Sequence, residues 1–190
     1  MQWTHEVNDL QGGDICFYLG CGQIVPCSVL SRFKHNLVVH ESDLPQGKGW
    51  SPLTWQILEG KNDIPVTLLR AVKKVDSGDI YLQEWLHFNG CETIDQLRHA
   101  QAKVTISLCQ QFIKEYPDVL TQARPQTGKS SFYPRRSPQD SELDPQRSLI
   151  EQFNLLRVVD NERYPAFFTW LGELYVIKIY HQLRPQNQEK

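Results

Sequence analysis

The sequence has 190 residues, 40% of them hydrophobic, which predicts one globular domain with a modest appendage. Its formal net charge of −2 excludes a general basic surface, so no nucleic-acid partner is expected. No apolar run approaches the roughly 18 residues of a membrane span, and the first residues lack the pattern of a signal peptide. These features predict a cytoplasmic protein with no membrane partner.

Cysteine usage gives no sign of disulfides or of a metal site. The five cysteines are odd in number and include no Cys-x-x-Cys pair of the kind that binds zinc. We therefore expect reduced, buried thiols and no metal.

The first part of the chain predicts strands that alternate with helices. Apolar runs predict buried strands over residues 14–19 and 36–40, with a short helix over 28–33 between them. Residues 52–58 fit a helix, because proline suits a first helical turn and Gly60 suits a helix end.

The next part predicts two strands and one long helix. Residues 64–72 and 80–86 are strand-like, and Pro65 belongs near a strand start or at an edge. The run Thr93-Ile94-Asp95-Gln96 has the form of a capping box, and the apolar spacing predicts that its helix continues to about Tyr116.

The C-terminal part differs in composition. Residues 123–144 are rich in proline and polar side chains and predict an irregular crossing segment. A helix over 148–159 follows, and then a hairpin of strands 166–170 and 174–179. Residues 183–190 predict a polar, frayed tail.

This order of elements predicts an α/β fold, with helices flanking a sheet and an added C-terminal helix and β-hairpin. We expect a catalytic core over residues 1–122, a C-terminal extension over 123–182 and the tail over 183–190.

Two candidate proton-transfer groups lie at strand ends. His40 closes the apolar run 36–40, and Asp76-Ser77-Gly78 follows the strand over 64–72. An imidazole and a carboxylate brought together suit general acid–base chemistry. Each also has a simpler interpretation: His40 as a hydrogen-bonded, partly buried histidine, and Asp76-Ser77-Gly78 as a turn.

Several motifs in order resemble one family. The motifs HxSxLP (40–45), GxxP (49–52), PVT (65–67) and DSG (76–78), after the strand and turn over 14–26, resemble the folate-dependent formyltransferases. That family includes methionyl-tRNA formyltransferase and the N-formyltransferases of nucleotide-linked amino sugars. The segments 132–136, 153–160 and 164–179 are similar to the region after the catalytic domain in the tRNA and sugar enzymes.

The resemblance implies a fold and a reaction. The fold would be a Rossmann-like formyltransferase sheet, N-terminally shortened, because the family's first strand and helix have no counterpart here. The reaction would move a formyl group from N10-formyltetrahydrofolate, without a metal, to a nucleotide-linked amino sugar for surface polysaccharide such as O-antigen.

The resemblance also implies roles for individual residues. His40 would stabilise the oxyanion, and Asp76 would orient its ring and help to remove the amine proton. The family carries Asn two residues before the histidine, where this chain has Val38. Asn36 is the candidate substitute, on the same face of the strand but about 13 Å away.

The resemblance suggests two further sets of residues. The folate cosubstrate would lie near two turns, and its expected contacts are Gly22, Ile24, Pro26, Leu69, Val72 and Asp76. The acceptor would meet the loop after His40 and the polar segment, where arginine suits phosphate, through Ser42, Gly49, Trp50, Tyr133 and Arg135.

Other interpretations stay open. A methionyl-tRNA formyltransferase would share the core, although it carries a larger C-terminal domain and the chain has no basic surface. A purine-pathway acceptor would leave the C-terminal segment unexplained. A binding-only member would explain Val38. The aromatic hairpin over 166–179 also suggests a homodimer.

Overall fold

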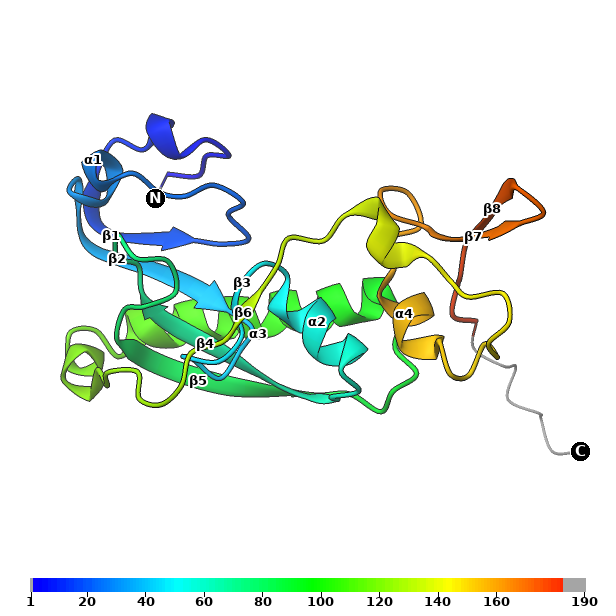
Figure 1. Ribbon diagram of the computed structural model, residues 1–190. Helices are drawn as coiled ribbons and strands as arrows, with labels where there is room; N and C mark the ends of the chain where they lie inside the picture. Colours follow the sequence, from blue (N-terminus) through cyan, green and yellow to red (C-terminus); the bar gives the residue numbers. More distant parts are fainter. Residues whose placement is uncertain (1, 183–190) are drawn as a thin grey trace, which may run out of the picture.

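A four-stranded mixed sheet forms the centre of the molecule, in a computed structural model that describes residues 2–182 (Figure 1). The predicted tail over 183–190 lies outside the described residues. The strand order is β1-β2-β4-β5, with β1 parallel to β2 and the other pairs antiparallel. The strands are β1 Gly13–Tyr18, β2 Phe33–His40, β4 Asp63–Arg70 and β5 Ile80–His87.

A long helix covers one face of this sheet. Helix α3, Ile94–Lys114, begins at the predicted capping box, in which Thr93 and Gln96 satisfy each other's backbone groups. Its Leu97, Leu108 and Phe112 are completely buried against the apolar side chains of β2, β4 and β5. The predicted long helix is therefore confirmed, with its apolar face against the sheet.

Alternation along β2 sends its side chains to opposite faces. Leu37 and Val39 belong to the core beneath α3. Val38 belongs instead to a second apolar cluster, with Leu44, Leu69 and Ile80. Because strand side chains alternate, His40 shares the face of Val38.

Shorter elements complete the core. Helix α2, Pro52–Leu58, has the predicted bounds. The two-residue strands β3, Lys48–Gly49, and β6, Phe132–Tyr133, pair in parallel. The remaining short helices are α1 Cys27–Leu30, η1 Val7–Asp9, η2 Asp118–Gln122 and η3 Pro138–Ser141.

The C-terminal extension packs at the end of the sheet where α2 lies. Figure 1 shows the segment after η2 running from the sheet toward α4, Phe153–Val158, and the hairpin β7–β8. The hairpin strands, β7 Ala166–Trp170 and β8 Glu173–Ile177, confirm the predicted hairpin. Several of its apolar side chains are exposed, among them Trp170, Leu171, Leu174 and Tyr175.

Two predicted helices differ from the structure in their bounds. The helix expected over 28–33 ends at Leu30, because Phe33 already pairs with Gly13 of β1. The helix expected over 148–159 begins only at Phe153. There the Gln152 amide donates to the carbonyl groups of Asp144, Arg147 and Ser148, which stabilises a turn in place of a helical ladder.

The segment expected to be irregular over 123–144 contains β6 and η3. Of the five cysteines, Cys21, Cys27 and Cys91 are exposed, contrary to the expectation of burial, and all five are free thiols. Within residues 2–182, no helix combines the length and apolarity that a bilayer span needs.

A buried arginine ties the extension to the core. Arg157 of α4 is fully buried; it donates to Asn62 Oδ1 at 2.6 Å and to Asn154 Oδ1 at 3.0 Å. Its Nη1 lies 3.6 Å from Glu92 Oε2. A buried guanidinium is tolerated only with such partners, so these contacts fix how α4 meets the sheet.

We predict that Arg157→Ala lowers the free energy of unfolding by about 3 kcal/mol, because it breaks a buried ion pair and leaves a cavity. Urea denaturation followed by far-UV circular dichroism measures this. The matched control, Arg147→Ala, removes an exposed arginine and should change stability by less than about 0.5 kcal/mol. Equal stability of the two variants would contradict the role assigned to Arg157.

Candidate active site

His40 is held at the end of β2 by its two ring nitrogens. Nε2 lies 2.9 Å from the carbonyl oxygen of Gly47, and a carbonyl only accepts, so Nε2 carries the hydrogen. Nδ1 lies 3.8 Å from Oδ1 of Asp76, an ion-pair distance when the ring is protonated. The ring can therefore hold or pass a proton at Nδ1, the nitrogen that faces the carboxylate.

Asp76 lies in the loop between β4 and β5 in a left-handed conformation, with φ of 49°. Its Oδ2 accepts a hydrogen bond of 2.9 Å from the backbone N–H of Gly49. The side-chain amide of Gln126 donates to the carbonyl oxygens of Asp76 and Gly78, both at 2.9 Å. The His40 and Asp76 side chains are only 8% and 7% exposed, so the pair is fixed and largely dry.

Residues 47–49, here called the bridging segment, connect both members of the pair. Gly47 supplies the carbonyl for His40, and Gly49 supplies the N–H for Asp76. Strand pairing positions this segment, because Lys48 and Gly49 of β3 lie opposite Phe132 and Tyr133 of β6. Gly49 has φ of 98°, and a Cβ there would lie 2.5 Å from the carbonyl oxygen of Tyr133.

Asn36 is engaged away from the pair. Its Oδ1 accepts from the Tyr18 hydroxyl at 2.9 Å, and its Nδ2 donates to the carbonyl oxygens of Leu30 and Phe33. These contacts join β1, β2 and the end of α1. The side chain of Asn36 therefore has a structural use, which disfavours the catalytic role suggested for it.

The predicted folate contacts fall in two places. Gly22, Ile24 and Pro26 lie in the loop between β1 and α1, where Ile24 is 75% exposed. Leu69 is fully buried in the cluster with Val38, in a strand that pairs with β2 on one side and β5 on the other. Val72 is half-buried in the loop after β4. The folate roles of these residues stay predictions.

Two of the predicted acceptor residues come together. The guanidinium carbon of Arg135 lies 5.0 Å from the centre of the Trp50 ring, a cation–π contact between the loop after His40 and the extension. Tyr133 instead stacks on Trp55 and donates to Glu59 Oε2 at 2.9 Å. Burial, together with Glu59, raises the pKa of Tyr133, which keeps its hydroxyl a donor.

Ser42 supports the loop through its backbone. Its carbonyl oxygen accepts from the Thr67 hydroxyl at 2.7 Å. Its own hydroxyl is buried and has no hydrogen-bond partner among the described residues. Ser42 is therefore buried against the core, and its acceptor role stays a prediction.

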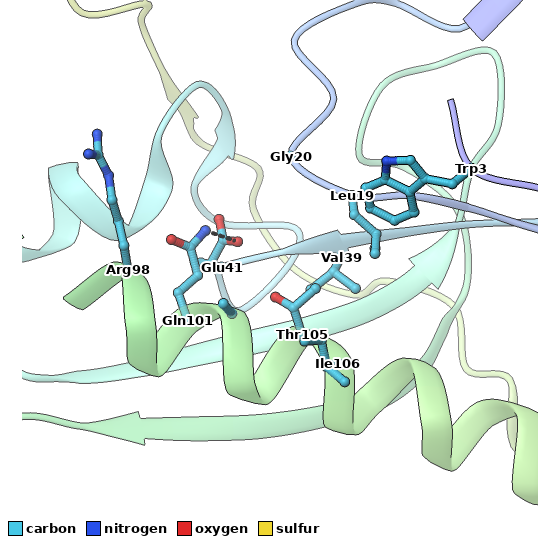
Figure 2. Close-up of a pocket in the computed structure, with 10 residues that line it drawn as sticks. Trp3, Leu19, Gly20, Val39, Glu41, Arg98, Gln101, Thr105 and Ile106 are labelled. Carbon is cyan, nitrogen blue, oxygen red and sulfur yellow. Dashed lines mark hydrogen bonds between the residues drawn. The ribbon is translucent and has the colours of Figure 1, made fainter. Parts of the chain in front are cut away.

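A cavity of about 270 Å³ lies on the α3 side of the strand ends (Figure 2). Arg98, Gln101, Thr105 and Ile106 of α3 line it from one side, and Val39 of β2 and Leu19, just after β1, line it from the other. Glu41 reaches into it and accepts from the Gln101 amide at 2.6 Å, the dashed line in Figure 2.

A second cavity of about 300 Å³ separates the core from the extension. It shares Glu41, Arg98 and Gln101 with the first cavity and adds Trp50 and Tyr164. Four arginines line it: Arg98, Arg135, Arg136 and Arg163. Glu41 and Trp50 directly follow His40 and Gly49 in the chain, so the cavity begins one residue from His40 and one residue from the glycine that donates to Asp76.

Asp160 organises one wall of this second cavity. Its Oδ2 accepts from Arg98 at 2.9 Å, and its Oδ1 accepts from the backbone N–H groups of Glu162 and Arg163. Burial alone would raise the pKa of Asp160, but these hydrogen bonds and the Arg98 charge outweigh burial and lower it to about 2.

Several of these residues carried no signal in the sequence. Glu41 and Arg98 look like ordinary surface charges, and Gln126 lies 50 residues from Asp76 in a polar stretch. Lys48 lies between two glycines in the loop after His40, where a lysine is ordinarily exposed, so the sequence gives no sign of its burial. Within residues 2–182, no three His, Cys, Asp or Glu side chains gather as a metal site.

Comparison with known proteins decides the family. A family model described as formyl transferase matches residues 3–112, which is more than half of the chain. This chain is a member of the formyl transferase family.

Solved structures of other formyltransferases have a fold similar to that of this chain. Methionyl-tRNA formyltransferase from Clostridium thermocellum matches with a TM-score of 0.71 and 22% identity, over 91% of this chain and 74% of that one. A 4-N formyltransferase from Francisella tularensis matches with a TM-score of 0.71 and 21% identity, over 94% and 75%. The predicted Rossmann-like α/β fold is thereby confirmed.

In a third case, this chain matches only part of a longer protein. HypX from Aquifex aeolicus in complex with tetrahydrofolic acid has a TM-score of 0.69 and 17% identity, over 93% of this chain and 31% of that one. The tRNA enzyme and the 4-N formyltransferase match this formyl transferase equally well, so fold alone does not identify its acceptor.

We predict that Gly49→Ala lowers the free energy of unfolding by about 3 kcal/mol, because it adds a clash with Tyr133 to an unfavourable φ. Gly128→Ala is the matched control: Gly128 also has a positive φ, 107°, but nothing lies within 4 Å of the added Cβ. Its cost should be about 1 kcal/mol, measured by chemical denaturation. An equal loss of stability in the two variants would contradict the close approach of Gly49 to Tyr133.

Asp160 should make stability depend on pH in acid. A pKa lowered from 3.8 to about 2 contributes stability that is present above pH 3.8 and lost as the pH falls toward 2. We predict that Asp160→Asn costs about 2 kcal/mol at pH 6 and progressively less between pH 4 and pH 2. Denaturation at several pH values tests this, with exposed Asp9→Asn as the control. A pH-independent difference would contradict the assignment.

Proposed function

We propose that this formyl transferase moves a formyl group from N10-formyltetrahydrofolate to the amine of a nucleotide-linked amino sugar. The observation that carries the proposal is the joint presence of the His40–Asp76 pair and the arginine-lined cavity beside it. The pair supplies proton transfer, and the cavity supplies a place for an anionic acceptor.

The reaction requires one proton to move. The amine of the acceptor attacks the formyl carbon, a new C–N bond forms, and the bond from that carbon to N10 breaks. The amine loses a proton and N10 gains one. In this proposal Asp76 accepts the amine proton and the same proton is then passed to N10, while the positive charge of the protonated His40 ring stabilises the oxyanion that develops on the formyl oxygen.

The lining of the second cavity favours a nucleoside diphosphate. Guanidinium groups match phosphate oxygens in charge and geometry, and Arg98, Arg135 and Arg163 come from three separate segments around one space. Trp50 and Tyr164 offer aromatic faces on which a base or sugar could stack. A cavity of about 300 Å³ is at the lower end of the range for small-molecule sites.

A methionyl-tRNA acceptor is the second candidate, because the tRNA enzyme matches this fold as well as the 4-N formyltransferase does. The formal net charge of −2 argues against it, since tRNA binding depends on neutralising many phosphates. A binding-only protein is the third, motivated by Val38 at the position of the family's asparagine.

The test measures release of tetrahydrofolate when purified protein is mixed with N10-formyltetrahydrofolate and an acceptor. Three acceptor classes are compared: nucleotide-linked amino sugars, the same amino sugars without a nucleotide, and methionyl-tRNA. Turnover with the first class alone supports the proposal. Turnover with the tRNA alone, or folate binding without any turnover, would overturn it.

We predict that His40→Gln lowers kcat by a factor of about 100 or more, because it removes the titratable group of the pair. His87→Gln is the matched control: His87 also pairs with an aspartate, Asp63, but its side chain is 71% exposed at the far end of β5. The control should keep the wild-type rate. An unchanged rate in His40→Gln would show that the active site has been misplaced.

A further inference from the structure

Lys48 is a buried charge in the bridging segment. It is only 4% exposed, although lysine normally keeps its ammonium group in water. Burying such a group is costly unless a partner compensates, and a methionine would fill similar space without that cost. The compensating contacts should therefore show what the charge does.

The ammonium group of Lys48 binds the loop that carries Asp76. Its Nζ donates to the Ser77 hydroxyl at 3.0 Å. That hydroxyl in turn donates to the carbonyl oxygen of Val75 at 2.9 Å. Ser77 is thus held by both Lys48 and Val75. Because Asp76 directly precedes Ser77 in the chain, these contacts restrain the backbone of Asp76.

Lys48 and its neighbour Gly49 form hydrogen bonds with two adjacent residues of the loop between β4 and β5. The ammonium group of Lys48 contacts Ser77, and the N–H of Gly49 donates to the Asp76 carboxylate at 2.9 Å. Two contacts in register restrain rotation of the loop as well as its distance. Without the Lys48 contact, the Gly49 N–H and the Gln126 amide would still bind the loop, but no group of the bridging segment would hold Ser77, and a small shift of the loop would move the carboxylate relative to His40.

The surroundings of Lys48 shift its pKa in opposite directions. Burial lowers the pKa of Lys48, the nearby Lys74 lowers it further, and the Asp76 carboxylate raises it. His40, at the end of β2, lies with its Nδ1 3.8 Å from Oδ1 of the same carboxylate. Lys48 therefore belongs electrostatically to the His40–Asp76 pair as well as contacting its loop.

We propose that Lys48 is a positioning residue of this enzyme: through Ser77 it fixes the Asp76 carboxylate in reach of His40. The inference rests on the proposed formyl transfer for its kinetic consequence, but its structural consequence does not depend on any substrate. Lys48 acts through Asp76 and not on the acceptor, so it should affect the rate of transfer more than the binding of either substrate.

The kinetic experiment compares Lys48→Met, Lys48→Arg and Ser77→Ala with the wild type. Lys48→Met should lower kcat about tenfold or more and change KM for each substrate by less than about twofold. Lys48→Arg, which keeps a charged donor, should recover a measurable part of that loss. Lys103→Met removes an exposed lysine of α3 and is the control, with wild-type kinetics expected.

A second readout needs no substrate. The Gly49 amide donates to a carboxylate, so its proton should resonate far downfield and exchange slowly in ¹⁵N-labelled protein. Lys48→Met and Ser77→Ala should each move this resonance and speed its exchange about tenfold or more, because the loop pivots away. If Lys48→Met does not fold, Ser77→Ala tests the same contact with Lys48 in place.

The outcomes separate this inference from the proposed function. Loss of kcat together with the Gly49 amide change supports the positioning role. An unchanged Gly49 amide in Lys48→Met and Ser77→Ala overturns it, whatever the kinetics, and so does a KM effect with unchanged kcat. If the wild type transfers no formyl group to any acceptor, the proposed function fails, and the amide readout alone decides the positioning role.

Discussion

The hydrogen bonds made by residues 47–49 are the constraint on which the rest of the site depends. The Gly47 carbonyl fixes one nitrogen of His40, and the Gly49 N–H fixes one oxygen of Asp76. The two candidate side chains do not form a short hydrogen bond with each other, since His40 Nδ1 and Asp76 Oδ1 lie 3.8 Å apart. Their mutual geometry therefore depends on backbone groups of a third segment, which truncation of a side chain does not remove.

The C-terminal extension helps to position the His40–Asp76 pair although it lies beyond the core. Strand β6 pairs with the bridging segment, and Gln126 holds the carbonyl groups beside Asp76. Arg157 then anchors the extension through buried contacts with the core. Loosening the extension would therefore disturb the pair from a distance, because the hydrogen bonds that place it come from both parts of the chain.

The alternation of side chains at the end of β2 divides the site into two sides. His40 faces the bridging segment and Asp76, while Glu41 contacts Gln101 on α3 (Figure 2). Among the described residues, Glu41 lines both cavities, and neither cavity is lined by His40 or Asp76. An acceptor held in the arginine-lined cavity would have to bring its amine over the end of the strand, where Trp50 lies next to Gly49.

Local patterns predicted the main strands and the long helix, and two of the candidate site residues. Apolar runs identified the four strands, a capping box identified α3, and the strand-end positions of His40 and Asp76 followed from those elements, because periodicity and capping act over a few residues. The packing of distant segments decided the rest. Asn36 turned out to bind Tyr18, while Lys48 and Gln126 turned out to hold the Asp76 loop, since hydrogen bonds between residues 18 to 50 positions apart leave no local trace in the sequence.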